Sequence, residues 1–390
     1  MRRDLILISI SMMTWGVGEG MFLFFSPLYM QELGANAVAI GSILGLTGLA
    51  MTLSYLPAGY LSDRIGRRPM LYTAWLMGTA ATWIMAYAKG LPMFVAGSIL
   101  YNMTAFVVVP LNSYVTAARG NWSVGRALTL ISATFNAGAV IGPLIGGWIG
   151  SRMGLHTNFT IAAWFFIAST LMVLFIRAQP IEASLSEEKH AGLRELLQAR
   201  YIQYLAVVFI AVFSMYLAIP LSQNFLQNER GINLAQMGVL ISARSVGVVL
   251  LNLTLGQLNA RIGFLLTHLC MAFFSILLLR GNGFYAYLVG YLLMGSYTTA
   301  RSLITAQGRS LAQASNMGVA YGMIETAAAS AIILASPLAG ILYAKNPNLI
   351  YSTSLVLIIA ALIVAIFFSP LRARDFRPQE KEGLEPARAD

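Results

Sequence analysis

The chain has 390 residues, of which 58% are hydrophobic and only 10% are charged, and its mean hydropathy is +0.71. Soluble domains carry about a quarter charged residues, so this composition excludes a water-soluble enzyme. The formal net charge of +10 would suit a nucleic-acid partner, but the long apolar runs favour a lipid bilayer instead, and we expect no nucleic acid. The single cysteine, Cys270, excludes a disulfide framework within the chain.

Twelve apolar runs, bounded by glycine, proline or charge, follow one another along the chain. Backbone polar groups must bond internally in lipid, and the runs do not alternate as barrel strands do, so we expect helices. A transmembrane helix needs about 20 residues, and the chain is long enough for twelve. The predicted spans are 5–29, 39–61, 70–88, 93–117, 128–150, 160–176, 203–225, 239–258, 265–279, 285–306, 323–343 and 349–368.

The basic residues support this count, because cytoplasmic loops of membrane proteins are enriched in Lys and Arg. With both termini in the cytoplasm, 18 of the 25 basic residues lie inside, five lie outside, and two, Arg244 and Arg301, lie within spans. Shifting the count by one span would destroy this asymmetry. We therefore predict a multi-pass protein of the cytoplasmic (inner) membrane, with both termini cytoplasmic.

The chain also contains an internal repeat. Eight residues between Glu32 and Gly66 recur 197 positions later, between Glu229 and Gly263. Two six-helix repeats, with substrate bound between them near the membrane midplane, are typical of secondary transporters. The predicted parts are an N-terminal half at 1–176, a cytoplasmic linker at 177–202, a C-terminal half at 203–369 and a cytoplasmic tail at 370–390.

The loop between the second and third spans reads GYLSDRIGRR at 59–68. It resembles the G-x-L-x-D-R-x-G-R-R signature of the major facilitator superfamily. The resemblance implies an all-α membrane protein with twelve transmembrane helices in two pseudo-symmetric halves. It also implies a cytoplasmic gate in which this loop holds the halves together. The residues expected there are Gly59, Asp63, Arg64, Gly66, Arg67 and Arg68. Alternatively, the arginines only anchor the loop on the cytoplasmic side.

The fifth predicted span contains a stripe of small residues. Four-residue spacing places Gly138, Gly142 and Gly146 on one helix face, beside Pro143 and Gly147, so a partner helix can approach closely. The string GAVIGPLIGG resembles the G-x-x-x-G-P-x-x-G-G motif of the family's proton-coupled antiporters, which are mostly multidrug exporters. Tight packing alone would also explain the stripe. The fourth span lacks the arginine that many of those exporters carry there.

Ionisable residues within spans are functional candidates, because a charge at membrane depth costs about 3 kcal/mol or more. Glu19 lies in the first span on one helix face with Met12, Trp15 and Phe22. In the family this span lines the central cavity, so the resemblance implies that this face contacts substrate. Glu19 is then expected to exchange a proton or bind a cation. The alternative is a structural carboxylate bonded to a neighbouring helix.

Polar residues of the C-terminal half complete the candidate cavity. Arg244 enters the eighth span from the outer side, and we expect it in the cavity, where it can meet Glu19 across the halves. Gln223 and Asn224, at the end of the seventh span, are expected to hydrogen-bond substrate near the outer mouth, or to be ordinary interfacial residues.

Arg301 and Glu325 lie near the inner ends of the tenth and eleventh spans. They are expected either to form an inner salt bridge at the cytoplasmic gate or to snorkel to the membrane interface.

No phosphate-binding loop and no catalytic or metal-binding constellation occurs, so we predict neither an enzyme nor a metal site. The preferred hypothesis is a monomeric exporter of small amphipathic or lipophilic compounds. It would work by proton antiport with alternating access, without a cofactor and with the proton gradient as its energy source. Two alternatives share the fold: an importer or uniporter of a small metabolite, and a lysolipid transporter. A third, a receptor or scaffold without transport, lacks the large soluble domain that would have supported it.

Overall fold

The computed structural model describes residues 3–179, 199–309, 311 and 317–368, apart from the side chains at 56–63, 109, 309, 317 and 318. These residues are helical almost throughout and contain no strand. Within the described ranges, nine helices are long and apolar enough to cross a membrane, or ten if the bent pair Leu91–Val107 and Pro110–Ala118 forms one span. The predicted all-α membrane fold is confirmed. Most of the linker and the whole tail lie outside the described residues, so the domain boundaries stay a prediction.

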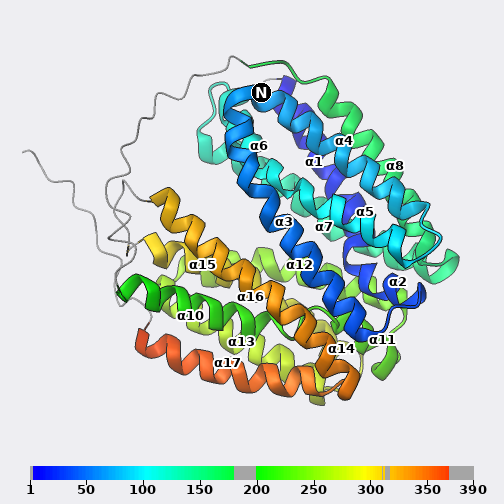
Figure 1. The fold of residues 1–390 in the computed structure, drawn as a ribbon, viewed down its shortest axis with the longest axis vertical. Helices are drawn as coiled ribbons and strands as arrows, with labels where there is room; N and C mark the ends of the chain where they lie inside the picture. The colour runs from blue at the N-terminus through cyan, green and yellow to red at the C-terminus, as the bar shows by residue number, and fades with distance from the viewer. Residues whose placement is uncertain (1–2, 180–198, 310, 312–316, 369–390) are drawn as a thin grey trace, which may run out of the picture.

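Each of the twelve predicted spans coincides with one helix or with consecutive helices, which Figure 1 shows as two groups. The N-terminal group comprises α1 (Arg3–Phe22), α2 (Ser26–Glu32), α3 (Ala37–Ile65), α4 (Arg67–Ala86), α5 (Leu91–Met103), α6 (Val108–Ala118), α7 (Val124–Met153) and α8 (Leu155–Leu174). The C-terminal group comprises α10 (Ala199–Tyr216), α11 (Ser222–Arg230), α12 (Leu234–Thr254), α13 (Ala260–Arg280), α14 (Phe284–Met294), α15 (Ser296–Arg309), α16 (Met317–Lys345) and α17 (Leu349–Phe368).

Two predicted spans, the third and the tenth, are not both long enough and apolar enough to be counted as membrane-crossing helices, and the reasons differ. Helix α4 has 20 residues but begins with two arginines and contains several polar residues, which lower its hydropathy. The tenth span is divided into α14, with 11 residues, and α15, with 14 residues. Helix α4 nevertheless packs along α5 and α8, and α14 packs along α12 and α13, as members of a bundle do.

Every third span is interrupted: the first, the fourth, the seventh and the tenth each consist of two helices with a break between them. Pro27 follows the break between α1 and α2, and Pro220 lies in the break between α10 and α11. The α5–α6 break is the 3-10 turn Thr104–Val107, and the α14–α15 break lies at Gly295. Backbone that leaves a helix at membrane depth is tolerated where protein buries it or where it lines a cavity. Such breaks therefore point to the binding site.

The sequence repeat has a structural cause at its glycines. Gly34 and Gly231, which are 197 positions apart, follow α2 and α11 with φ of +89° and +67°, a conformation that glycine adopts readily. Gly41 packs against the backbone of Gly340, joining α3 to α16, and Gly238 packs against Gly147, joining α12 to α7. Both of these helix pairs between the groups therefore depend on glycine contacts.

Candidate functional site

A cavity of about 260 Å³ lies between the two helix groups, next to the broken spans. Phe24 and Pro27 border it from the α1–α2 break, and Ile219 and Pro220 border it from the α10–α11 break. The cavity is slightly smaller than the range of about 300–1,000 Å³ that is usual for ligand pockets, so it suits a small molecule. Its polar lining side chains are Ser26, Thr47, Ser98, Tyr101, Asn102, Tyr216 and Gln223.

The Glu19 carboxylate is held at the edge of this cavity by two hydrogen bonds. The hydroxyl of Tyr101 on α5 donates to Oε2 over 2.7 Å, and the indole Nε1 of Trp15 donates to the same atom over 3.1 Å. Tyr101 itself lines the cavity. Glu19 is half-buried, whereas Trp15 and Tyr101 are only 7% and 6% exposed. The carboxylate is thus bonded to a neighbouring helix, as the structural alternative requires, and also lies one side chain away from the cavity.

Trp15 belongs to an aromatic cluster inside the N-terminal group. Its ring meets Phe166 at a centroid distance of 4.4 Å and Trp75 at 5.1 Å, both edge to face. Trp75 in turn donates a hydrogen bond to the hydroxyl of Ser11 over 2.9 Å. The expectation that Trp15 lines the cavity is therefore corrected: this packing buries the indole, and its N–H orients Glu19.

Of the other residues on the predicted cavity face, Phe22 lines the cavity and Met12 does not. Phe22 lies just before the break in the first span, where the cavity reaches the backbone, whereas Met12 lies almost three helical turns earlier.

The Arg244 guanidinium lies over the ring of Phe24, at 4.7 Å from the ring centroid. Its Nε atom is buried and has no hydrogen-bond partner. The structure describes both Glu19 and Arg244 and shows no ion pair between them. The expected pairing across the halves is thus not formed here, because Glu19 bonds to Tyr101 and Trp15 while Arg244 stacks on Phe24.

The two helix groups are joined at one end by a cluster of amides. Gln31 and Asn228, which occupy equivalent positions of the repeat, exchange two hydrogen bonds of 3.1 Å. The Asn224 amide donates to Gln31 Oε1 over 2.7 Å and to the carbonyl oxygen of Pro27 over 3.1 Å. Asn224 is 1% exposed and does not line the cavity, whereas Gln223 does. In this structure Asn224 therefore joins the two groups and is buried away from the cavity, although its Oδ1 has no hydrogen-bond partner.

Further bonds join the groups between this end and the middle of the bundle. Ser242 and Ser245 of α12 donate to the carbonyl oxygens of Val140 and Ala139 on α7. By the predicted topology, the amide cluster lies on the outer side. These hydrogen bonds between the groups therefore lie from the membrane middle outward.

Two arginines of the loop after α3 donate hydrogen bonds to side chains on α4 and in the segment after α8. Arg67 donates to Gln179 over 3.4 Å, and Arg68 donates to the hydroxyl of Tyr72 over 2.6 Å. Gly66 has a φ of +86°, which lets the chain turn directly from α3 into α4. Arg64 is exposed.

The surroundings of Gly59 and the side chain of Asp63 lie outside what the structure describes, so the expected gate is not tested at those two positions.

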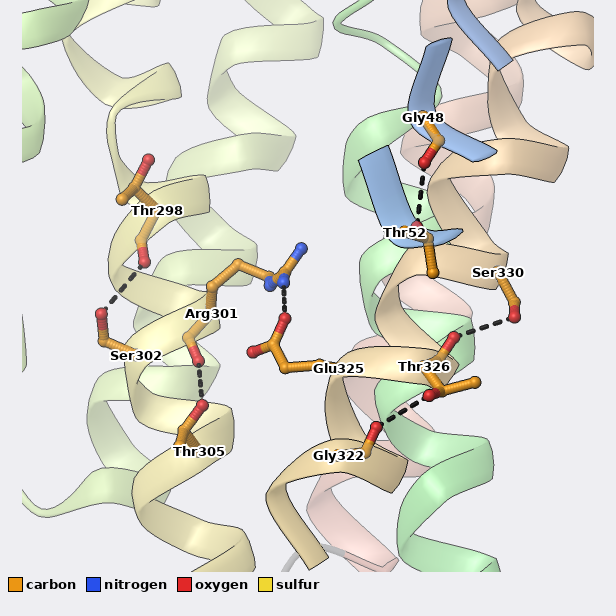
Figure 2. A network of polar contacts seen from close by, with 10 residues as sticks. All are labelled: Gly48, Thr52, Thr298, Arg301, Ser302, Thr305, Gly322, Glu325, Thr326 and Ser330. Carbon is orange, nitrogen blue, oxygen red and sulfur yellow. Dashed lines mark hydrogen bonds and ion pairs between the residues drawn. The ribbon is translucent and has the colours of Figure 1, made fainter. Parts of the chain in front are cut away.

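Arg301 and Glu325 form an ion pair, and Figure 2 shows the two side chains pointing toward one another from α15 and α16. The side chains are 26% and 56% exposed, so this pair contributes only about 0–1 kcal/mol to stability. Both helices belong to the C-terminal group, and the pair therefore does not bridge the halves.

The glycine stripe of α7 packs against two different helices. Gly138, Gly142 and Gly146 contact the backbone of α1, and a methyl group added at Gly146 would lie 2.7 Å from the carbonyl oxygen of Met21. A methyl group at Gly147 would lie 2.6 Å from the carbonyl oxygen of Leu234, at the start of α12. Pro143 contacts Gly238 of α12 through its carbonyl oxygen. The motif therefore fixes the N-terminal group internally and also joins it to the C-terminal group.

The contact at Gly147 gives the first prediction. Gly147→Leu is expected to lower the free energy of unfolding by about 1–3 kcal/mol, because backbone on the facing helix leaves no room for a side chain. The matched control is Gly125→Leu on the same helix, since Gly125 is exposed and has nothing within 4 Å of its added Cβ. Thermal unfolding of the purified variants measures the difference, and equal stability of the two would contradict the packing assignment.

Two features of this site were not found from the sequence. Tyr101 belongs to an apolar span, and nothing in its local sequence marks it as the partner of Glu19. Gln31, in contrast, could have been found, because it lies 197 residues before Asn228, the same offset as the repeat.

Comparison with known proteins decides the family. The family model described as Major Facilitator Superfamily matches residues 6–221 and, a second time, residues 204–389. The chain belongs to the major facilitator superfamily. It is a multi-pass membrane transporter and not an enzyme.

Similar proteins include a multidrug resistance protein and a multidrug efflux pump. Multidrug resistance protein MdtG of Yersinia enterocolitica is 24% identical over 290 residues, covering 71% of this chain and 70% of that protein. Multi-drug resistance efflux pump PmrA of Streptococcus pneumoniae is 26% identical over 209 residues, and the chain spans about half of its length, 51%. The crystal structure of nucleoside transporter NupG superposes with a TM-score of 0.76 at 13% identity, covering 94% of this chain and 98% of that one. At that identity the likeness shows the fold alone.

Proposed function

We propose that this major facilitator transporter exports small amphipathic or lipophilic compounds by proton antiport, with Glu19 as the proton-carrying group. The observation that carries the proposal is the position of Glu19: a partly exposed carboxyl deep in the first span, bonded to a cavity-lining tyrosine. The multidrug-efflux relatives support the export direction. The cavity walls support the substrate class, because Phe22, Phe24 and three methionines offer adaptable apolar contacts.

Protonation of Glu19 would change the hydrogen bonding of the cavity wall. As a carboxylate it accepts from both Tyr101 and Trp15. A proton taken up on Oε1, which neither side chain contacts, would leave Oε2 accepting both bonds, but as the oxygen of a neutral carboxyl it would hold them more weakly. Uptake of a proton would therefore loosen the hold of Glu19 on Tyr101, which lines the cavity. Proton and substrate would in this way act on the same side chain.

The contacts between the two groups support alternating access. The hydrogen bonds of the amide cluster and of α12 with α7 lie from the middle of the bundle to the predicted outer side. Rocking of the two groups about the α3–α16 and α7–α12 contacts would break the amide cluster and open the outer side.

The test uses purified protein in liposomes with an imposed pH gradient. A panel of lipophilic dyes is expected to move against its own concentration gradient when protons flow the other way, and to stop when an ionophore abolishes the gradient. If wild-type protein ignores the gradient across the whole panel, the antiport proposal is wrong. Gradient-independent uptake of one polar metabolite would favour an importer or uniporter, and movement of a lysolipid would favour the lipid transporter.

A further inference from the structure

We propose that Arg244 is a binding site for the anionic group of the substrate, so that the preferred cargo is an amphipathic compound carrying a carboxylate or a phosphate. This inference deepens the proposed function and rests on it, because it names the substrate class of the same cavity. A purely cationic lipophilic substrate would be attracted by the Glu19 carboxylate and would have no use for Arg244.

The first step is the charge balance of the interior. Glu19 and Glu325 are the acidic side chains nearest the middle of the described spans. Glu325 pairs with Arg301, and Glu19 accepts hydrogen bonds from Tyr101 and Trp15. Arg244 is left with no carboxylate partner among the described residues. A guanidinium at membrane depth costs about 3 kcal/mol or more, so an uncompensated one points to a function.

The second step is the position of Arg244, which is not itself among the residues that line the cavity but lies directly behind one of them. Its guanidinium rests on the face of Phe24, at 4.7 Å from the centroid, and Phe24 lines the cavity. The side chain as a whole is partly exposed, while its Nε is buried and makes no hydrogen bond. Stacking on an aromatic ring holds the plane of a guanidinium and leaves its edge available as a hydrogen-bond donor. The buried Nε–H is thus a donor without an acceptor.

The third step is the chemistry of the missing partner. A guanidinium presents paired N–H groups that match two oxygens of a carboxylate or phosphate. Tyr216, Tyr291 and Tyr297 lie near enough to interact electrostatically with Arg244, and Tyr216 also lines the cavity. An anion bound to Arg244 would thus face tyrosine side chains at its head and the apolar wall of Phe22 and Phe24 along its body. An amphipathic anion combines these two requirements.

The test compares ring-matched probes with full-length protein in nanodiscs of phosphatidylcholine: 2-naphthoate, 2-naphthyl phosphate and (2-naphthylmethyl)trimethylammonium. Titration calorimetry is expected to show both anions binding at least about tenfold more tightly than the cation. Arg244→Gln should reduce this preference to within about threefold, and Arg244→Lys should restore part of it, because a lysine keeps the charge but not the paired donors.

The matched control is Arg152→Gln. The Arg152 guanidinium also lies 4.7 Å from an aromatic centroid, that of Trp148, but both residues are exposed and lie at the end of α7. This variant should keep the wild-type preference. Adding phosphatidylglycerol to the nanodiscs distinguishes the sources of the anion: a lipid headgroup would weaken both anionic probes by competition, whereas a soluble substrate would leave them unchanged.

Equal binding of anion and cation by the wild-type protein, absence of binding by every probe, or an unchanged preference in Arg244→Gln would each overturn the inference. The wild-type comparison needs no variant, so it stands even if Arg244→Gln fails to fold. Failure of the proposed function looks different: anion binding would persist in nanodiscs while the liposome assay shows no gradient-driven flux.

Discussion

Glu19→Gln is expected to abolish dye transport driven by a pH gradient, reducing it to the level of protein-free liposomes. The glutamine side chain has nearly the same shape and can still accept a hydrogen bond from Tyr101, but it cannot carry a proton at neutral pH. Exchange of dye without any gradient should persist, because the cavity between the helix groups stays intact. Measuring gradient-driven uptake and gradient-free exchange in parallel distinguishes loss of proton coupling from loss of folded protein.

Two further variants sharpen this prediction. Tyr101→Phe is expected to slow gradient-driven transport by roughly tenfold or more, since a hydrogen bond to a charged group contributes about 1.5–3 kcal/mol. Glu229→Gln is the matched control, because it makes the same substitution at an exposed carboxylate at the end of α11 and should transport normally. If Glu19→Gln kept full gradient-driven uptake, Glu19 would be the structural carboxylate of the alternative hypothesis.

Linking residues 31 and 228 to each other is expected to stop transport completely. Gln31 and Asn228 pair across the two helix groups, and alternating access requires them to separate. In a Cys270→Ala background, Gln31→Cys and Asn228→Cys together can be linked with a bifunctional methanethiosulfonate. Transport should fall to background and return when dithiothreitol cleaves the link. The liposome dye assay measures both changes.

The singly substituted proteins control for chemical modification and for loss of the amide bonds. A neutral hydrogen bond contributes about 1 kcal/mol, so each single variant treated with the reagent should lose no more than about fivefold in rate. A cross-linked double variant that transports at the rate of the singles would show that the amide cluster does not separate during transport. The rocking of the two groups would then need another axis.

The sequence alone predicted the spans because membrane insertion depends on local composition. Each span is a stretch of apolar residues, and each satisfies its backbone within itself, so its position can be predicted without knowing its neighbours. The loop at 59–68 and the glycine stripe of α7 carried the family resemblance for a similar reason: a tight turn and a close helix contact each need small residues at set positions. The family match confirmed the resemblance.

Contacts of single side chains could not be predicted in the same way. Glu19 and Arg244 were both candidates, but which partners they bond depends on helix rotation and on the breaks in the first and fourth spans. In the structure Glu19 accepts hydrogen bonds from Tyr101 and Trp15, and the Arg244 guanidinium lies over the ring of Phe24. Asn224, expected to contact substrate, instead joins the helix groups, since α11 lies against α2.

Composition and spacing thus predicted that this chain crosses the membrane many times in repeated halves, and two motifs carried the resemblance to the major facilitator superfamily that the family match confirmed. Tertiary structure alone decided that Glu19 has a cavity-lining tyrosine as its partner, that Arg244 has no carboxylate partner among the described residues, and that the amides of Gln31, Asn224 and Asn228 join the groups at one end. The physical reason is how far along the chain each interaction reaches. Apolarity and backbone bonding act within one helix, whereas a polar side chain in a bundle bonds to whichever neighbouring helix the packing brings within about 3 Å.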